Sequence, residues 1–489
     1  MNKTNNDHRW IATPAPLASR YDDIFFITPD VGWAVNGNGQ ILKTENGGGQ
    51  WQLQRQLDGA YLRCIGMTTD GTHGWVGCVT PGKQLYRTSD GGKTWTLVDN
   101  LPKKYISQEK ADAPSAVCGL WVLDKDHVFA AGTNYPERPA RFFKTDDGGK
   151  TWIVRDMEDL ACILVDIYFQ NDQIGWVVGG RSVRPNPRRD DVVPTILKTT
   201  DGGKSWTDML KYEKDKPLNV PLGEWGWKIQ FLENDPEFGV VACENLKAGA
   251  IFITEDGGDS WRRQEIRDEC HMINENLEGI GFWNRNIGWV GGWGDATFDS
   301  GRTSETRDGG KTWIDMTGSW PKPTDGYLCP PRCNIGQYIN RFRFVGQDEK
   351  RVAYASGNTV YKYTNQELYE QKEGEVASNR LLGATELKIA ADRALVPLTI
   401  PEGATSLSVV IYDRFAGQVR TLLEEQNPAA GDRSLSWDLR DDNGQKLPPG
   451  QFMVRVTCDG YAESRLIFPE RTGTRIPLTA SIPHQLRED

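Results

Sequence analysis

The chain has 489 residues, a formal net charge of −10 at pH 7, 18 tryptophans and nine cysteines. The acidic balance argues against a nucleic-acid-binding protein, and without a run of about eighteen apolar residues no membrane insertion is expected. A chain of this length can bury a large core, and two domains are expected.

The N-terminal segment bears on location. Residues Met1 to His8 lack the apolar core of a signal peptide, so a cytoplasmic location is expected. A periplasmic or secreted location is the alternative if a leader peptide has been removed.

A hexapeptide, Asp-Gly-Gly-Lys-Thr-Trp or a close variant, occurs six times. Its tryptophans lie 44, 57, 54, 55 and 52 residues apart. A period near 50 indicates one supersecondary unit copied in tandem, and such units stack to bury their apolar faces. The six tryptophans are Trp51, Trp95, Trp152, Trp206, Trp261 and Trp313.

Each copy is preceded by three short apolar or alternating segments. In one unit these are an apolar stretch at Asp166–Phe169, a Gly-Trp segment at Gly175–Val178 and an alternating segment at Ile196–Thr199. Short β-branched runs bounded by Gly, Asn and Asp are typical of strands joined by tight turns. Four-stranded units repeated radially make a β-propeller.

The seventh unit lacks the hexapeptide. Val352–Gly357 and Thr359–Tyr363 match the second and third strands of the other units. We expect the fourth strand to come from the N-terminus, with Trp10 in the place of a hexapeptide tryptophan, which closes the ring and removes exposed strand edges. The sequence therefore predicts a seven-bladed propeller over residues 8–366.

A second, smaller domain follows. Residues 367–385 are polar and charged, as in a linker, and residues 386–470 carry alternating strands at 395–400, 407–413, 434–438 and 451–456. About a hundred residues of such strands predict a small β-sandwich. Residues 471–489 form a C-terminal tail. The fold class is all-β.

The turn chemistry of the hexapeptide is structural. Its Asp accepts hydrogen bonds from backbone amides, its glycines supply positive φ, and its Trp covers the seam between blades. We therefore expect no catalytic residue and no metal ligand among these motifs.

The motifs resemble known families. The hexapeptide resembles the Asp-box (BNR) repeat, and the longer pattern, with Ile196-Leu197-Lys198-Thr199 before Thr200-Asp201-Gly202-Gly203-Lys204-Ser205-Trp206, resembles the Ycf48-like photosystem II assembly factors. That resemblance implies a seven-bladed propeller whose Arg-rich face receives a partner polypeptide. The run from Ile411 to Leu422, with Trp437–Gly444 and Leu447–Gly450, resembles the FlgD Ig-like domain, which implies a docking or assembly module.

The cysteines predict no metal centre. Cys64 and Cys118 occupy matching positions of their units, as do Cys78 and Cys243, so they are expected to be small buried strand residues. Cys329 and Cys333 are interpreted as two free thiols, with a disulfide or half of a zinc site left open. No cofactor is expected.

Binding residues are expected on the rim opposite the hexapeptide turns, where the second-to-third strand loops and the connections between blades are long and irregular. Arginines beside aromatic residues there suit carboxylates, although the same arginines could simply pair with Asp190 and Asp191. The segment Glu224–Trp227 is interpreted as part of a connection between blades. The candidate binding residues are Arg138, Arg181, Arg184, Arg188, Arg189, Trp225, Trp227, Trp293 and Arg302.

Two functions remain open. The first is a non-enzymatic scaffold that binds a protein or peptide, which could be acidic, and aids assembly of a larger complex. The alternative is a sialidase-like glycoside hydrolase, in which Glu224 and Asp295 could form a carboxylate pair. An Arg-Ile-Pro motif, which sialidases carry near the N-terminus, occurs only at Arg475–Pro477. Its position favours the scaffold.

Overall fold

The computed structural model describes residues 8–16, 18–102, 116–211, 220–245, 249–267, 276–292, 303–316, 335, 338–364, 381–382, 388–390, 393–448 and 452–467. These residues form β-strands and two short 3-10 segments, η2 (Arg189–Asp191) and η3 (Asp348–Lys350). Within this part of the chain, no helix is long and apolar enough to cross a membrane.

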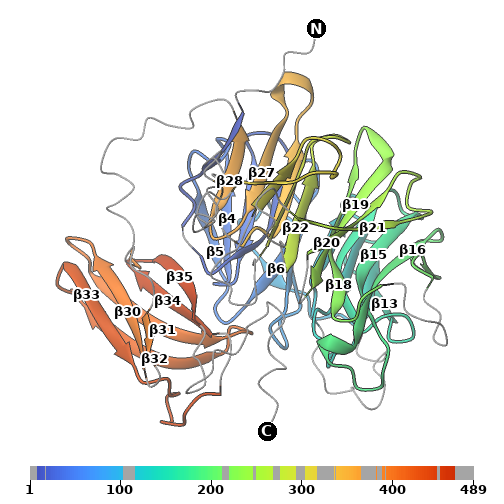
Figure 1. Ribbon diagram of the computed structural model, residues 1–489. Helices are drawn as coiled ribbons and strands as arrows, with labels where there is room; N and C mark the ends of the chain where they lie inside the picture. The colour runs from blue at the N-terminus through green and yellow to red at the C-terminus, as the bar shows by residue number, and fades with distance from the viewer. Residues whose placement is uncertain are drawn as a thin grey trace, which may run out of the picture.

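Seven four-stranded antiparallel sheets form the predicted propeller (Figure 1). Blade 1 contains β2 (Tyr21–Phe26), β3 (Gly32–Asn36), β4 (Gln40–Thr44) and β5 (Gln52–Gln56), and blade 2 contains β6 (Leu62–Met67), β7 (Gly74–Cys78), β8 (Leu85–Thr88) and β9 (Thr96–Leu97). Blade 3 contains β10 (Gly119–Val122), β11 (Val128–Gly132), β12 (Arg141–Thr145) and β13 (Ile153–Asp156), and blade 4 contains β14 (Ile163–Phe169), β15 (Gly175–Ser182), β16 (Val192–Thr199) and β17 (Thr207–Asp208). Blade 5 contains β18 (Glu224–Leu232), β19 (Asp235–Asn245), β20 (Ala250–Thr254) and β21 (Arg262–Glu265), and blade 6 contains β22 (Leu277–Phe282), β23 (Gly288–Gly292), β24 (Thr303–Thr306) and β25 (Ile314–Asp315).

Blade 7 joins both ends of the propeller chain. It contains β26 (Arg341–Val345), β27 (Val352–Ser356), β28 (Val360–Thr364) and, as its outer strand, β1 (Arg9–Ala12). β1 pairs antiparallel with β28, with Trp10 opposite Tyr363. The predicted closure of the ring by the N-terminal strand is therefore confirmed.

Trp10 fills a seam between blades. Its side chain is fully buried and packs edge-on against Trp289 of blade 6, with ring centroids 5.4 Å apart. Trp95 and Trp206 occupy equivalent places in the apolar clusters between blades 1 and 2 and between blades 3 and 4. Such seams bury the apolar faces that a single blade would leave exposed.

The Asp-Gly-Gly turns are held by their own side chains. In blade 2, Asp90 Oδ1 accepts hydrogen bonds from Thr94 N at 2.9 Å and from Thr88 Oγ1 at 2.8 Å. These contacts lower the pKa of Asp90 to about 2, the hydrogen bond from the Thr94 side chain being the largest cause. The next two residues, Gly91 and Gly92, have φ of 73° and 86°, which favours glycine.

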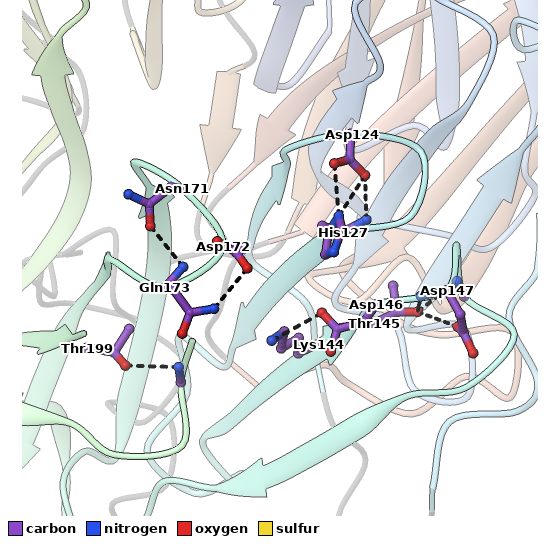
Figure 2. Close-up of polar contacts among 12 residues, drawn as sticks. Asp124, His127, Lys144, Thr145, Asp146, Asp147, Asn171, Asp172, Gln173 and Thr199 are labelled. Atoms are coloured by element: carbon purple, nitrogen blue, oxygen red, sulfur yellow. Dashed lines mark hydrogen bonds and ion pairs between the residues drawn. The ribbon is translucent and has the colours of Figure 1, made fainter. Parts of the chain in front are cut away.

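Each of these turns also binds the neighbouring turn of its blade. In blade 3, Gly148 N donates to Asp126 O at 3.0 Å, while Asp124 Oδ1 accepts from the backbone N–H of Asp126 and His127, both at 2.8 Å. Figure 2 shows the contacts of Asp124 with His127 in blade 3 and, in blade 4, the contact of Asn171, which takes the place of Asp124, with Gln173. The hexapeptide therefore has the structural role that its composition predicts.

The C-terminal module is a two-sheet β-sandwich (Figure 1, orange and red). One sheet contains β29 (Lys388–Ala390), β30 (Arg393–Ile400) and β33 (Gly431–Trp437), and the other contains β32 (Gln418–Gln426), β31 (Ser406–Asp413), β34 (Phe452–Cys458) and β35 (Tyr461–Ile467). Strands β29, β32 and β35 were not predicted; β32 was missed by the alternation pattern because it is an edge strand that is nowhere fully buried. Leu381 and Leu382, within the predicted linker, pack in the core of this sandwich.

The module rests on the propeller rim opposite the Asp-Gly-Gly turns. Ser19 N, before β2, donates to Ser464 Oγ at 2.7 Å, and Arg455 Nη1 donates to Asn38 O in the β3–β4 loop at 3.3 Å. In the β7–β8 loop, Thr80 Oγ1 donates to Phe415 O at 2.6 Å. The rim expected to bind a partner is thus covered on blades 1 and 2 by the chain's own second domain.

Candidate binding surface at the channel mouth

The channel is lined by the innermost strand of each blade, and five of these strands shift register at an equivalent place. Such a bulge leaves one residue out of the ladder and re-aims its side chain. Two of these residues, Asp22 and Arg63, contact each other across the boundary between blades 1 and 2. The residues at the five shifts are Asp22, Arg63, Val165, Trp227 and Glu278.

One buried charge network connects blades 1, 2, 6 and 7. Asp22 Oδ1 lies 2.8 Å from Arg20 Nε and 2.6 Å from Arg63 Nη1. Arg20 Nη2 also donates to Glu278 Oε2 at 2.5 Å, and Asn340 Nδ2 donates to the same oxygen at 2.5 Å. All five side chains are buried, so each charge depends on its partners rather than on water.

A second network crosses the channel. Arg341 of blade 7 binds Asp166 of blade 4 through two hydrogen bonds of 2.8 Å, and its Nε donates to Asp23 Oδ1 of blade 1 at 2.9 Å. Asp23 also accepts from Ile65 N at 3.2 Å, and Asp166 from Ile229 N at 3.0 Å. The Arg341 guanidinium therefore binds two carboxylates. Each carboxylate is also held by a backbone N–H of the following blade, blade 2 for Asp23 and blade 5 for Asp166.

Lys228 adds a second cation to this network. Burial, followed by repulsion from Arg341, lowers the pKa of Lys228 to about 8. Burial alone would raise the pKa of Asp166, but attraction to Arg341 and Lys228 lowers it overall. The channel interior is therefore organised as paired charges that hold blades together.

The channel mouth combines aromatic rings and arginines. The Arg138 and Arg189 guanidinium carbons lie 5.2 and 5.4 Å from the Tyr135 ring centroid, and Arg189 lies 5.0 Å from the ring of Trp225. Arg189 Nη2 donates to Asn134 O at 2.6 Å. All of these side chains are buried, so they face the interior of the mouth and not open solvent.

Glu244 completes the mouth. Its Oε2 accepts from Trp225 Nε1 at 3.1 Å, while its Oε1 lies 3.9 Å from Arg189 Nη1. Burial raises the pKa of Glu244 to about 8, although attraction to Arg189 opposes this rise. A carboxyl group in this position retains its proton near neutral pH.

The predicted arginine loop between β15 and β16 is only partly exposed. Arg181 Nε donates to Leu160 O at 3.0 Å and Arg184 Nε lies 3.3 Å from Asp191 Oδ1, as in the alternative in which the arginines pair with local acids. Arg184 is 67% exposed, and Arg188 is also exposed. The structure separates these two from Arg138 and Arg189, which are buried in the mouth.

The interpretation of Glu224–Trp227 as a connection between blades is wrong. These residues begin β18, the innermost strand of blade 5, in which Trp227 is left out of the ladder between Gly226 and Lys228. Trp225 and Trp227 are buried in one apolar cluster with Val165. Trp293 and Arg302 lie outside the described residues.

Glu224 is fully engaged. Its two oxygens accept from Arg263 Nε at 2.8 Å and Nη2 at 2.7 Å, and Oε2 also accepts from Asn245 Nδ2 at 2.6 Å. The side chain is buried. A carboxylate neutralised in this way is poorly suited to act as a glycosidase acid or nucleophile. Asp295, its proposed partner, lies outside the described residues.

The described His, Cys, Asp and Glu side chains are dispersed or buried. Where the structure describes the chain, no group of three or more His, Cys, Asp or Glu side chains could hold a metal ion. Cys64, Cys78, Cys118 and Cys243 are free and buried, as expected for small strand residues. Cys329 and Cys333 lie outside the described residues.

Sequence reasoning missed the channel networks and the role of the module. One signal was available: Asp23 and Asp166 each precede an equivalent apolar run in the sequence, at Ile24–Phe26 and Ile167–Phe169. A carboxylate repeated beside a buried apolar run indicates a charge that must be paired inside. Nothing in the repeat pattern points to Arg341 as the partner of both.

Two family models match the chain. The model described as Photosynthesis system II assembly factor YCF48 matches residues 2–106, and the model described as FlgD Ig-like domain matches residues 385–460.

Two curated relatives are named Photosystem II assembly lipoprotein Ycf48. The one from Synechococcus sp. (strain CC9902) is 26% identical over 293 residues, which is 54% of this chain and 81% of the relative. The one from Trichormus variabilis (strain ATCC 29413 / PCC 7937) is 28% identical over 325 residues, which is 50% of this chain and 89% of the relative. The name lipoprotein does not support the expected cytoplasmic location.

Solved structures with a similar shape include YCF48 bound to D1 peptide, which is 15% identical, covers 73% of this chain and 97% of that chain, and has a TM-score of 0.48. YCF48 from Cyanidioschyzon merolae is 16% identical, covers 73% and 98%, and has a TM-score of 0.49. An ancestral GH74 enzyme is 11% identical, covers 94% of this chain and 63% of that chain, and also has a TM-score of 0.49. The resemblance to Ycf48-like proteins and to the FlgD Ig-like domain, drawn from the motifs, is confirmed by the family models and the two relatives.

Proposed function

We propose that this protein is a non-enzymatic scaffold that binds a polypeptide partner and aids the assembly of a larger protein complex. The observation that carries the proposal is the channel, whose polar side chains are committed to holding blades together through Arg341, Asp23 and Asp166. The two relatives named as assembly lipoproteins also support a scaffold function.

The hydrolase alternative finds little support in the described residues. Glycosidases need two carboxyl groups that face a substrate, one of them able to donate a proton. Glu224, the residue considered for this role, is buried and holds Arg263 with both oxygens. A fold shared with hydrolases does not by itself imply their chemistry.

The partner surface that we propose is the part of the rim that the module leaves open. Arg184 and Arg188, in the β15–β16 loop, present exposed guanidinium groups there. Arginine binds carboxylates in a bidentate manner, so an acidic segment of a partner would suit this loop. Arg181 supports the loop from below by binding Leu160 O.

In-cell photo-cross-linking tests the proposal. A photoreactive amino acid replaces Arg184 or Arg188 in the full chain, and a matched control replaces Lys204, an exposed residue of an Asp-Gly-Gly turn on the opposite rim. We expect one defined protein, a subunit of a larger complex, to be captured from both loop positions and not from Lys204. Equal capture from all three positions, or none from the loop, would contradict the proposal.

An exported location forms part of this proposal, because both relatives are named lipoproteins. Fractionation of cells that express the untagged protein checks it. Recovery of the protein with the soluble cytoplasmic enzymes would instead support a cytoplasmic location and contradict export.

A further inference from the structure

The tip of the β31–β32 hairpin, residues 413–417, is a preformed turn. Asp413 Oδ1 accepts from the backbone N–H of Phe415 and of Gly417, both at 2.8 Å, and Ala416 has a φ of 63°. All of these bonds lie within the module. The turn therefore keeps its shape whether or not the module touches the propeller.

This turn is inserted into the channel mouth. Ala416 is buried in one cluster with Tyr61 and Trp225 of the propeller, and Phe415 O accepts from Thr80 Oγ1 at 2.6 Å. The Phe415 ring lies edge-on to Tyr135, with centroids 5.3 Å apart. A folded turn of the module thus occupies the mouth much as a bound peptide would.

The turn covers one propeller arginine and adds a further positive charge. The Arg138 guanidinium lies 4.1 Å from the Phe415 ring centroid, and Arg414 lies 5.1 Å from the Tyr135 ring. Together with Arg189, three guanidinium groups surround Tyr135 at 5.1 to 5.4 Å. Cation–π contacts stabilise each of them, but the three charges repel one another.

These charges are incompletely matched. Arg189 Nη1 and Arg414 Nη1 are buried and have no hydrogen-bond partner. Two acidic side chains lie near these arginines, with Glu244 Oε1 3.9 Å from Arg189 Nη1 and Glu137 Oε1 3.8 Å from Arg414 Nη2. A buried guanidinium N–H without an acceptor is costly, so an added carboxylate would stabilise the mouth more than the turn does.

We propose that residues 413–417 act as a displaceable plug over a recognition site for an acidic peptide segment with an aromatic side chain. The aromatic ring would take the place of Phe415 between Tyr135 and Arg138, and carboxylates would pair with Arg138 and Arg189. Displacement also moves Arg414 away, which relieves the repulsion among the three guanidinium groups. This inference rests on the proposed function, since it names the kind of polypeptide that the scaffold receives.

Peptide binding to the full chain tests the plug. The probe is a fluorescein-labelled peptide, Gly-Asp-Glu-Phe-Asp-Glu-Gly, and its control replaces each acid by Asn or Gln. When a site is covered in most molecules, its apparent affinity equals the intrinsic affinity multiplied by the fraction of molecules in which the site is open. We therefore expect Phe415→Ala to tighten binding of the acidic peptide about tenfold or more, with no tightening for the control peptide.

Further variants separate recognition from folding. Arg138→Gln in the Phe415→Ala background should abolish the gain, Arg138→Lys should retain part of it, and Arg55→Gln, an exposed arginine on β5, should leave it unchanged. If Phe415→Ala lowers the melting temperature, Phe415→Leu serves instead, because it keeps apolar volume in the mouth and removes the ring contacts with Tyr135 and Arg138. Equal affinity of the wild type and both plug variants would overturn the inference.

A distance measurement gives an independent readout. Spin labels on unnatural amino acids at Lys204 and Glu424, both exposed, report the separation of propeller and module. We expect the acidic peptide to lengthen and broaden this distance. An unchanged distance with the peptide bound would show that the turn stays in the mouth and would reject the plug. A dimer that forms with increasing concentration and persists when the peptide is added would also reject it. Neither outcome would alter the cross-linking result, which tests the proposed function separately.

Discussion

On the Asp-Gly-Gly rim six of the seven blades repeat one arrangement, whereas in the channel several blades contribute different side chains to two charge networks. Asp90 and Asp147 bind groups within their own turns, at a sequence separation of 2 to 4 residues. Arg341 and Asp166 are 175 residues apart and lie in blades 7 and 4. The repeated turns therefore make many small and independent contributions to the stability of the fold, whereas the channel residues make a few large ones.

The two regions differ in how well they tolerate amino-acid substitution. A repeated turn can lose one hydrogen bond while its neighbours remain intact, as blade 1 illustrates, where Asn46 replaces the Asp and still accepts from Gln50 N at 2.8 Å. A channel residue has no such substitute. Removal of one partner there leaves another charge buried and unpaired.

Arg341→Met tests the channel side most strongly. The change removes the guanidinium that binds both Asp23 and Asp166 and leaves Arg343, 3.4 Å from Asp23, and Lys228 as the other described cations of the network. We expect the free energy of unfolding to fall by about 3–5 kcal/mol. Urea denaturation measures the effect against Arg55→Met, an exposed arginine. Adding Asp23→Asn and Asp166→Asn should recover part of the loss, and failure to recover any would show that charge is not the cause.

Trp10→Ala tests the seam that closes the ring. Loss of a fully buried indole costs about 3 kcal/mol, and here it also weakens the pairing of β1 with β28. Trp51→Ala, at a seam position that is only half-buried, should cost less. Thermal unfolding of both variants checks the order, and a larger loss for Trp51→Ala would argue against a special role of the closing strand.

Glu244→Gln tests the pH dependence of the mouth. The folded protein keeps this proton up to about pH 8, whereas the ordinary pKa of such a carboxyl is near 4.5. The folded state therefore binds more protons between these values, and stability falls as pH rises through that interval. Urea titrations from pH 5 to pH 8 should show a steeper fall for the wild type than for Glu244→Gln, and parallel curves would contradict it.

Asp147 gives the smallest expected effect. Asp147→Asn keeps the acceptor for Thr151 N and should lower the melting temperature by less than Asp147→Ala, with both changes below about 4 °C. The Thr151 hydroxyl lowers the pKa of Asp147 to about 2. The Asp contribution is present above its ordinary value of 3.8 and is lost as pH falls towards 2. Scanning calorimetry from pH 2 to pH 7 follows this loss.

The propeller could be predicted because its signals are local. The hexapeptide, the Gly-Trp segment and the tryptophan spacing each report one blade, and Trp10 at the N-terminus supplies the one element that blade 7 lacks. Most strands of the module followed from alternation for the same reason. The edge strand β32 did not, because its side chains alternate little in burial.

The candidate site was harder to predict because it depends on contacts between distant segments. Arg138 and Phe415 meet only when the module docks, and no local pattern records that meeting. Trp225 and Trp227 looked like loop residues because Gly226 separates them, yet that glycine marks a bulge within β18. The exposed Arg184 and the buried Arg189 lie five residues apart and could not be told apart from composition.

The pairing of β1 with β28 also constrains how the protein is made. Thr13 binds the carbonyl of Val360, which lies 347 residues further along the chain. At ordinary rates of synthesis, roughly 5–20 residues per second, strand β1 is made roughly 20–70 s before its partner. Until β28 is available, β1 is an unpaired edge that can join another chain. A chaperone that shields strand β1 during this interval would therefore raise the yield of closed rings.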